Sequence, residues 1–498
     1  MPLLRSTGDP VPQPARALDA LRSPRLLTRE ALAGVVTVLA LVPEVISFSV
    51  VAGVDPRTSL VASVVLLAVT TVLGGRPAMV TAAAGSVALV IAPLVHAHGA
   101  AYVLPAVVLG GLVQILFGVL GLARLLRFVP RSVMLGFVNA LGVLIFAAQV
   151  PHLIGVPWVA YPLFALTLAV VLLLPRFTTA VPAALVAIVV VTAIAVVAGL
   201  DVPSVGDEGR VGGALPGITP LTVPLDATTL GIVWPTALSV AFVGLLESLL
   251  TAKLVDRITD TPSRKNRESW GLGVANVGAA LWGGIGGCAM IGQTMVNVKA
   301  GGGRTRLSTG VAAVFLLGLL TVLGPVLAII PMVALAAVMM VVAVTTVDWH
   351  SVRPATLRRM PLPETAVLVV TVAVVLVTGN LAVGVGVGVL LAMVLFARRV
   401  AHVTTVDRRV VDGVARYDVR GPLFFGSSND LIDRFAYADD PAETVVDLTH
   451  AQVWDASTVA ALDAVEQRYA DHGRAVRFEG LDERSTAFHA RLTGRLGA

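Results

Sequence analysis

Two carboxylic acids lie inside apolar stretches of this 498-residue chain, where a charged side chain is costly. Glu247 stands in the run GLLESLLT, residues 244–251. A carboxylate at the centre of a membrane costs roughly 2.5–3.5 kcal/mol on insertion scales, so it must face a cavity or a partner, or carry a proton. Thr251 lies one helical turn further on the same face and can add an oxygen ligand. We predict that Glu247 and Thr251 form a coupling-ion site for Na⁺ or H⁺; the alternative is a helix-end carboxylate near the membrane interface.

Glu44 is the second acid, and it follows Pro43 in another apolar run. The proline removes one backbone hydrogen bond from a helix and loosens the helix there. Glu44 could therefore line the cavity and contribute to the coupling-ion site, and Phe48, one turn on, could form an apolar wall of an anion site. The alternative is a structural acid that pairs with a free backbone N–H group or with an arginine.

Two short segments rich in glycine and other small residues occupy matching positions in the two halves of the chain. Residues 74–86 are GGRPAMVTAAAGS, and residues 283–294 are GGIGGCAMIGQT. Such a matched pair of interrupted segments is typical of the binding site of a transporter. A helix that begins inside the membrane presents unpaired N–H groups and the positive end of its dipole, so two such helices facing each other attract an anion. The alternative is that these glycines only allow close helix packing.

The elements that must position these residues are apolar segments that recur from about residue 31 to residue 397. A helix of about 20 residues crosses a hydrocarbon core roughly 30 Å thick. Together with the two interrupted segments, the pattern predicts fourteen elements, seven in each half, in a transport domain over residues 29–400. The predicted elements are 31–50, 58–73, 79–95, 101–122, 132–149, 158–174, 180–199, 228–254, 270–284, 289–299, 308–328, 330–346, 364–379 and 381–397.

The composition is that of an integral membrane protein, with 56% hydrophobic and only 13% charged residues, against about 25% charged in soluble domains. Basic residues gather in short polar stretches, as they do in cytoplasmic loops. We therefore expect an inner or plasma membrane location with both termini in the cytoplasm, residues 1–28 forming a cytoplasmic N-terminal segment. The net charge of +5 reflects these loops and indicates no nucleic-acid partner. The sequence shows no metal-ligand cluster, P-loop or nucleophile motif, so we expect neither a cofactor nor an enzyme.

The composition changes after residue 400, and residues 408–498 are mixed polar and apolar. We expect strands at Val410–Val419 and Thr444–Leu448, a helix at Ser457–His472, and a last strand at Ala475–Phe478. Alternating strands and helices predict a small α/β domain.

The chain resembles the SulP (sulfate permease) family of inorganic anion transporters along nearly its whole length, with a STAS domain at its C-terminal end. The motifs that carry the resemblance are residues 244–251, 283–294, 296–301 (VNVKAG), 304–308 (RTRLS), 421–426 (GPLFFG), 446–448 (VDL) and 455–457 (DAS). The resemblance implies an all-α polytopic membrane domain of 14 segments in a 7+7 inverted repeat, with core and gate domains, plus a small α/β STAS-like cytoplasmic domain. It also implies a homodimer in the lipid bilayer and transport by alternating access.

The resemblance further implies an anion site between the starts of the third and tenth elements, and a Na⁺ site at Glu247 and Thr251 in the family's sodium–bicarbonate symporters. Three departures from the family's pattern affect these sites: the acid is Glu instead of Asp, a Pro-Thr pair is Ala83-Ala84, and a common Arg is Gln293. The anion field must then rest on helix ends and backbone N–H groups. The implied anion-binding residues are Ala84, Gly85, Ser86, Ala289, Met290 and Ile291, with Gly287, Gly292 and Gln293 behind them.

The function expected from the sequence is secondary active transport of a small inorganic anion, bicarbonate or sulfate, coupled to Na⁺ or H⁺. The alternatives are an uncoupled anion channel or exchanger, a dicarboxylate carrier, and a membrane-anchored STAS sensor. A nucleobase permease would share the membrane fold, but the STAS-like domain argues against it. Ser457 falls near the phosphorylated position of soluble STAS relatives; regulation there is one option, and a role in trafficking, dimer contacts or folding is another.

Overall fold

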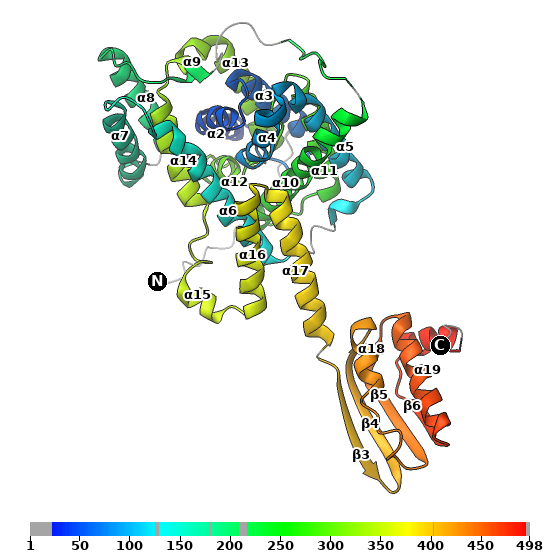
Figure 1. The fold of residues 1–498 in the computed structure, drawn as a ribbon. Helices are drawn as coiled ribbons and strands as arrows, with labels where there is room; N and C mark the ends of the chain where they lie inside the picture. The colour runs from blue at the N-terminus through cyan, green and yellow to red at the C-terminus, as the bar shows by residue number, and fades with distance from the viewer. Residues whose placement is uncertain are drawn as a thin grey trace. The chain divides into compact units, whose positions relative to one another are not determined.

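The computed structural model describes residues 22–124, 129–178, 182–208, 217–224, 226–401 and 403–494. The chain forms two compact units, Met1–Gly388 and Val389–Ala498, and helix α17 runs from the first into the second. The first unit is helical, and the second contains a four-stranded sheet (Figure 1). The predicted combination of an all-α membrane domain with a small α/β domain is therefore confirmed.

The helices of the first unit have the apolar character that a bilayer demands. Within the described ranges, six helices are long and apolar enough to cross a membrane, and six shorter apolar helices accompany them. Together with α11 and the short α12, they provide a counterpart for each of the fourteen expected elements.

Eight of these elements, named here the core helices, pack in two related halves. Helix α2 packs on α13 as α10 packs on α5, and α3 packs on α13 as α11 packs on α5. This repeated pattern is the one expected of an inverted repeat. The bounds of the core helices are α2 Pro24–Val51, α3 Pro56–Leu73, α4 Gly85–His98, α5 Val103–Val119, α10 Ala227–Thr259, α11 Lys265–Ala280, α12 Ile291–Met295 with a π-helical turn Val296–Ala300, and α13 Arg306–Ala328.

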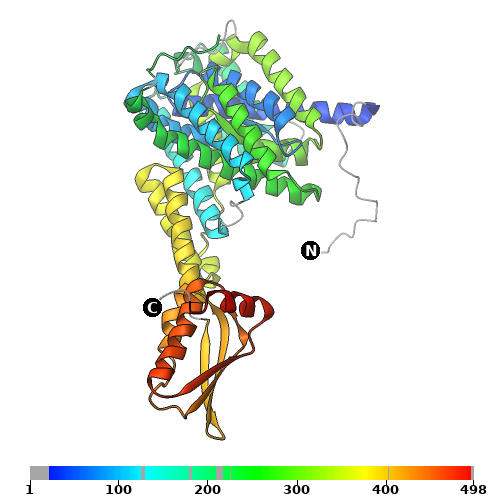
Figure 2. The ribbon, with the colours of Figure 1, turned by 90° about the vertical axis from the view of Figure 1, so that its right-hand side faces the viewer.

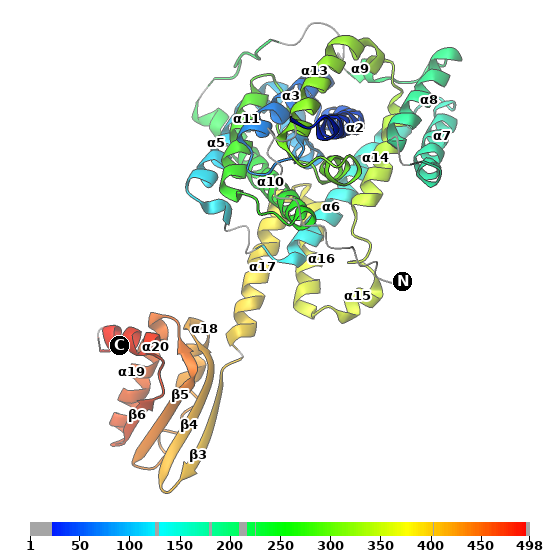
Figure 3. The same cartoon turned by 180° about the vertical axis from the view of Figure 1, so that it is seen from behind.

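The remaining long helices, named here the gate helices, form a second set. Helix α6 packs on α16 as α14 packs on α7, and α2 lies between α3 of its own set and α14 of the gate set in the two opposite views (Figures 1 and 3). The bounds are α6 Arg131–Gln149, α7 Ala160–Leu173, α8 Ala183–Val197, α14 Met332–Thr346, α16 Leu362–Thr378 and α17 Leu381–Ala401, and the short connecting helices are Ala100–Tyr102, Val150–Leu153, Leu174–Arg176, α9 Val205–Glu208 and α15 Pro354–Arg359.

The two interrupted segments meet in the middle of the core helices as short strands. Strand β1, Thr81–Ala83, pairs antiparallel with β2, Gly287–Ala289. A residue with positive φ precedes each strand: Ala78 at 60° and Gly286 at 68°. Extended backbone inside a membrane must satisfy its polar groups within the protein, and this pairing does so while leaving α4 and α12 to begin immediately afterwards.

The second unit folds as an α/β domain. Its sheet has the order β3-β4-β5-β6, in which β3 and β4 are antiparallel and the other neighbours are parallel. Helix α19 lies along the sheet (Figures 1 and 2), and exposed Ser457 falls in its first turn. The bounds are β3 Thr405–Val411, β4 Val414–Leu423, α18 Phe425–Ile432, β5 Glu443–Val453, α19 Ala456–Asp471, β6 Ala475–Glu479 and α20 Glu483–Leu492.

The single strand expected at Val410–Val419 was wrong, because that stretch contains a hairpin turn. Asp412 and Gly413 have φ of 53° and 78°, and they join β3 to β4. Two successive positive φ values are the geometry of a tight two-residue hairpin, for which Asp-Gly is a preferred pair. The Asp-Gly signal was present in the sequence and should have divided the strand.

A buried carboxylate organises the core of this domain. Asp440 is 3% exposed and accepts hydrogen bonds from Tyr417 Oη at 2.7 Å and from Tyr469 Oη at 2.5 Å. Arg408 adds an ion pair at 2.7 Å. Burial raises the pKa of both phenols above their ordinary value, so these tyrosines stay protonated and keep donating to Asp440.

Candidate anion and coupling-ion site

The site lies where the two discontinuous elements cross. Ala84 precedes α4, whose first two residues are Gly85 and Ser86, and Met290 precedes α12, which begins at Ile291. Among the described residues, no side chain caps either helix start. Both helix starts therefore keep backbone N–H groups that no side chain caps, and each carries the positive end of its helix dipole.

The strand pair is held in place by side chains from neighbouring helices. Asn276 of α11 accepts from Gly287 N at 2.7 Å and donates to Gly287 O at 3.1 Å. The Ser63 hydroxyl of α3 accepts a hydrogen bond from Ala83 N at 3.1 Å. The Ser248 hydroxyl of α10 accepts one from Ala289 N at 2.9 Å. These bonds fix the backbone from which the two helices begin.

Gly287 and Gly292 have different environments. A methyl group on Gly287 would lie 2.0 Å from Ala82 O, whereas a methyl group on Gly292 would meet no atom within 4 Å. Gly287 therefore allows the close approach of the two strands, and Gly292 faces open space in the first turn of α12.

Glu247 reaches directly into this site. Its carboxyl accepts a hydrogen bond from Ser86 Oγ, and it also interacts with the Cys288 thiol, which lies 3.7 Å from Ser86 Oγ. The side chain is buried, with Glu247 9% exposed, and lies in the middle of α10. The structure thus places Glu247 away from any helix end.

Thr251 joins the same helix to the second strand. Its hydroxyl lies 2.8 Å from Ala289 O and 2.9 Å from Glu247 O, and donates toward these carbonyl groups. The Thr251 hydroxyl, the Ala289 carbonyl and the backbone carbonyl of Glu247 therefore bring three oxygen atoms to one place. Oxygen atoms are the donors that hard cations prefer.

Phe48 and Glu44 of α2 form the opposite side of the site. A methyl group on Gly85 would lie 2.5 Å from Phe48 Cε1, so the aromatic ring packs directly against the start of α4. The Glu44 carboxyl interacts with the Gln293 side chain and electrostatically with Glu247. Glu44 thus lies close enough to both residues to affect the charge of the site.

The electrostatics of the site are unusual for an anion site. Among the described residues, no arginine or lysine forms an ion pair with Glu44 or Glu247, and no group of three or more His, Cys, Asp or Glu could hold a metal ion. Helix ends supply the attraction, while two carboxyl groups oppose it when ionised.

The structure places the starts of α4 and α12, Glu247 of α10 and Phe48 of α2 around one region, and several residues that the sequence did not indicate lie there too. Cys288 contacts the Ser86 hydroxyl, and Ser63, Ser248 and Gln114 support the strands. Gln114 stands alone as a polar side chain in an apolar run, which was a usable signal. A serine in a membrane helix gives no such signal, because its hydroxyl usually bonds within its own helix.

Comparison with known proteins agrees with this architecture. Residues 27–162 and 157–371 match the sulfate permease family, and residues 405–494 match the STAS domain. The Bacillus subtilis protein named "Putative sulfate transporter YbaR" is 46% identical over 459 residues, which cover 92% of this chain and 95% of that protein.

Two solved structures share the fold. The transmembrane domain of a cyanobacterium bicarbonate transporter, BicA, aligns with a TM-score of 0.63 and 26% identity, covering 74% of this chain and 98% of that one. The murine Slc26a9 anion transporter, in its inward-facing state, aligns with a TM-score of 0.81 and 17% identity, covering 93% and 87%. The chain is therefore an integral membrane transporter, not an enzyme, and it belongs to the sulfate permease family, with a STAS domain at its C-terminal end.

Proposed function

We propose that this protein is a proton-coupled symporter of a small oxyanion, with sulfate as the first candidate substrate and bicarbonate as the second. The observation that carries the proposal is the hydrogen bond from Ser86 Oγ to the Glu247 carboxyl. It links the acid of α10 to the first turn of α4, where the anion is expected to bind. One group of the anion site is thus engaged by the coupling residue.

The charges of the site explain why a cation must accompany the anion. An incoming anion meets the favourable helix ends together with Glu44 and Glu247, which repel it when ionised. A proton on Glu247 removes one repulsion. It also weakens the hold of the carboxyl on the Ser86 hydroxyl, which is then free to donate to the anion. Binding of the proton and binding of the anion therefore favour each other, and this reciprocity is the thermodynamic requirement for coupling.

Movement of the core helices relative to the gate helices would expose the loaded site to each side in turn. The packing of the two sets supports this alternating-access cycle, because each set repeats its own internal contacts. The homodimer and the cytoplasmic position of both termini remain predictions from the sequence and belong to the same proposal.

Sodium is a second candidate for the coupling ion. The Thr251 hydroxyl and the Ala289 carbonyl oxygen lie 2.8 Å apart, one helical turn from Glu247, and with the Glu247 carboxylate these oxygen atoms could bind Na⁺ after a small outward shift. In this alternative mechanism Glu247 stays ionised, and Na⁺ replaces the proton as the neutralising charge.

The test is uptake of labelled sulfate, and separately of labelled bicarbonate, into proteoliposomes with an imposed pH gradient or an imposed Na⁺ gradient. Accumulation of sulfate driven by the pH gradient is the expected result. Accumulation driven only by Na⁺ would replace the proton with sodium. Flux insensitive to both gradients would favour a channel or an exchanger. A protein that moves neither anion would contradict the proposal and favour a dicarboxylate carrier or a STAS sensor.

A further inference from the structure

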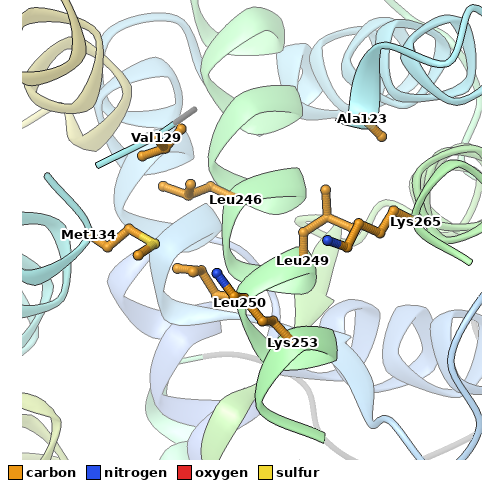
Figure 4. A pocket seen from close by; sticks show the side chains of 8 residues that line it. All are labelled: Ala123, Val129, Met134, Leu246, Leu249, Leu250, Lys253 and Lys265. Atoms are coloured by element: carbon orange, nitrogen blue, oxygen red, sulfur yellow. The ribbon is translucent and has the colours of Figure 1, made fainter. Parts of the chain in front are cut away.

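A small crevice opens beside Glu247 on a neighbouring face of α10. It encloses about 60 Å³, and a single water molecule needs roughly 10–15 Å³ of such space. The crevice therefore has room for one small oxyanion. Figure 4 shows the eight side chains that line it: Ala123, Val129, Met134, Leu246, Leu249, Leu250, Lys253 and Lys265.

The walls come from both sets of helices. Leu246, Leu249, Leu250 and Lys253 recur at helical spacing along one face of α10, and Met134 faces them from gate helix α6. Lys253 lies six residues beyond Glu247, which corresponds to about 9 Å along the helix axis. The crevice is thus next to the coupling site and lies on the C-terminal side of it.

Both cationic side chains at the crevice extend toward Leu249 and Leu250, one from α10 and the other from the beginning of α11 (Figure 4). Neither lysine forms an ion pair within the described ranges. The acids nearest to them in sequence are engaged elsewhere: Asp256 pairs with Arg76 at 3.1 Å, and Glu268 accepts from Gly75 N at 2.6 Å.

The type and position of these cations also need an explanation. The chain has 36 basic residues, of which only three are lysine, and two of those three line this crevice. Lys265 is the first residue of α11, where the helix dipole disfavours a positive charge. Two like charges that share a small crevice without an acid repel each other, and an anion between them would relieve that repulsion.

We propose that Lys253 and Lys265 form an antechamber site that holds a small oxyanion on its way to or from the Ser86–Glu247 site, and that their two charges favour a dianion over a monoanion. This inference rests on the proposed anion transport. The apolar walls contribute no hydrogen bonds, so the anion keeps part of its hydration shell and binds weakly enough to move on.

The expected effect follows from the charges. We take each lysine ammonium group to lie about 6 Å from the anion in water, with a Debye length of about 8 Å. Loss of both lysines then lowers the affinity of the crevice roughly tenfold for a dianion and roughly threefold for a monoanion. The change should appear in KM, because the site lies outside the place where the anion crosses between the two sides. It should grow at low ionic strength.

The experiment compares K253Q/K265Q with wild type, measuring initial uptake of labelled sulfate and of labelled bicarbonate in right-side-out and in everted membrane vesicles. K299Q is the matched control, since Lys299 is the third lysine, is exposed and lies outside the crevice. K253R/K265R keeps both charges and should keep KM within about twofold of wild type.

The expected result is a sulfate KM raised roughly tenfold for entry from the lysine side only, with a smaller rise for bicarbonate and an unchanged maximal rate. Three outcomes would overturn the antechamber while leaving the proposed function intact. They are a sulfate KM of K253Q/K265Q within twofold of wild type, an equal rise of KM in K299Q, and an equal rise of KM in both vesicle orientations. Wild-type vesicles that take up neither anion would instead overturn the proposed function, and the antechamber with it.

Discussion

Replacement of Glu247 by glutamine tests the coupling mechanism most directly. The amide is nearly isosteric with the carboxyl and can still accept the hydrogen bond from Ser86 Oγ, but it is neutral at every pH. An anion bound at Ser86 would lie about two hydrogen-bond lengths, roughly 5–6 Å, from the carboxyl of residue 247. With an effective dielectric constant of about 20, the repulsion between the carboxylate and a monoanion such as bicarbonate at that distance is about 3 kcal/mol, and the repulsion of a dianion such as sulfate is about twice as large.

For the monoanion this energy corresponds to roughly a hundredfold in the dissociation constant, and for sulfate the factor is larger. Wild-type affinity should therefore rise as the pH falls and the carboxyl becomes neutral, by up to this factor. In E247Q the affinity should be high at neutral pH, and the part of the pH dependence that residue 247 causes should be lost, leaving only the part that Glu44 causes. Because residue 247 can then carry no proton with the anion, a pH gradient should no longer drive accumulation, although exchange of labelled for unlabelled anion should persist.

The assay measures sulfate binding to the purified protein and gradient-driven uptake into proteoliposomes across a range of pH. E364Q is the matched control, since Glu364 is an exposed acid in the first turn of α16, and its pH dependence should equal that of wild type. Accumulation by E247Q under a pH gradient would refute the coupling role. A wild-type affinity that does not change with pH would refute the electrostatic argument.

Three further predictions concern packing and the STAS domain. Gly85→Ala should cost about 1–3 kcal/mol of stability, because the added methyl group overpacks against the Phe48 ring, and it should impair uptake. Gly292→Ala places its methyl group in open space and should be tolerated. Thermal unfolding and sulfate uptake measure both variants, and equal effects would contradict the packing argument. Asp440→Ala should destabilise the STAS domain by about 3 kcal/mol, because two buried tyrosines lose the carboxylate that accepts their hydrogen bonds. Asp418→Ala removes an exposed ion pair and should cost less than about 1 kcal/mol. Limited proteolysis compares the two variants, and similar cleavage rates would contradict the role of Asp440. Burial raises the pKa of Tyr437 to about 12, so the stability that this phenol contributes is complete below about pH 10 and is lost as the pH rises through 12. A titration followed by tyrosinate absorbance should show an ionisation step near pH 12 that Y437F lacks. An unchanged titration in Y437F would disprove the assignment.

The sequence by itself determined the elements and their character. Charge depletion and apolar runs of membrane-spanning length are local properties, so they predicted fourteen segments and a separate α/β domain without any contact information. The glycine-rich segments were equally local, because interruption of a helix in a membrane is written in the residues that interrupt it. The hairpin at Asp412 and Gly413 was also a local signal, and the predicted strand wrongly ran across it.

Only the tertiary structure decided which residues meet. Ser86 and Glu247 are 161 residues apart, and whether they touch depends on how α4 and α10 pack, which no local pattern encodes. Gln293 is a plain polar residue until α2 brings Glu44 beside it. Lys253 and Lys265 are ordinary loop-proximal cations in the sequence, and they share a crevice because α10, α11 and α6 enclose it. Periodicity and hydrophobicity specify what each segment buries, whereas the partners of the few polar groups inside the membrane are set by long-range packing of the folded chain.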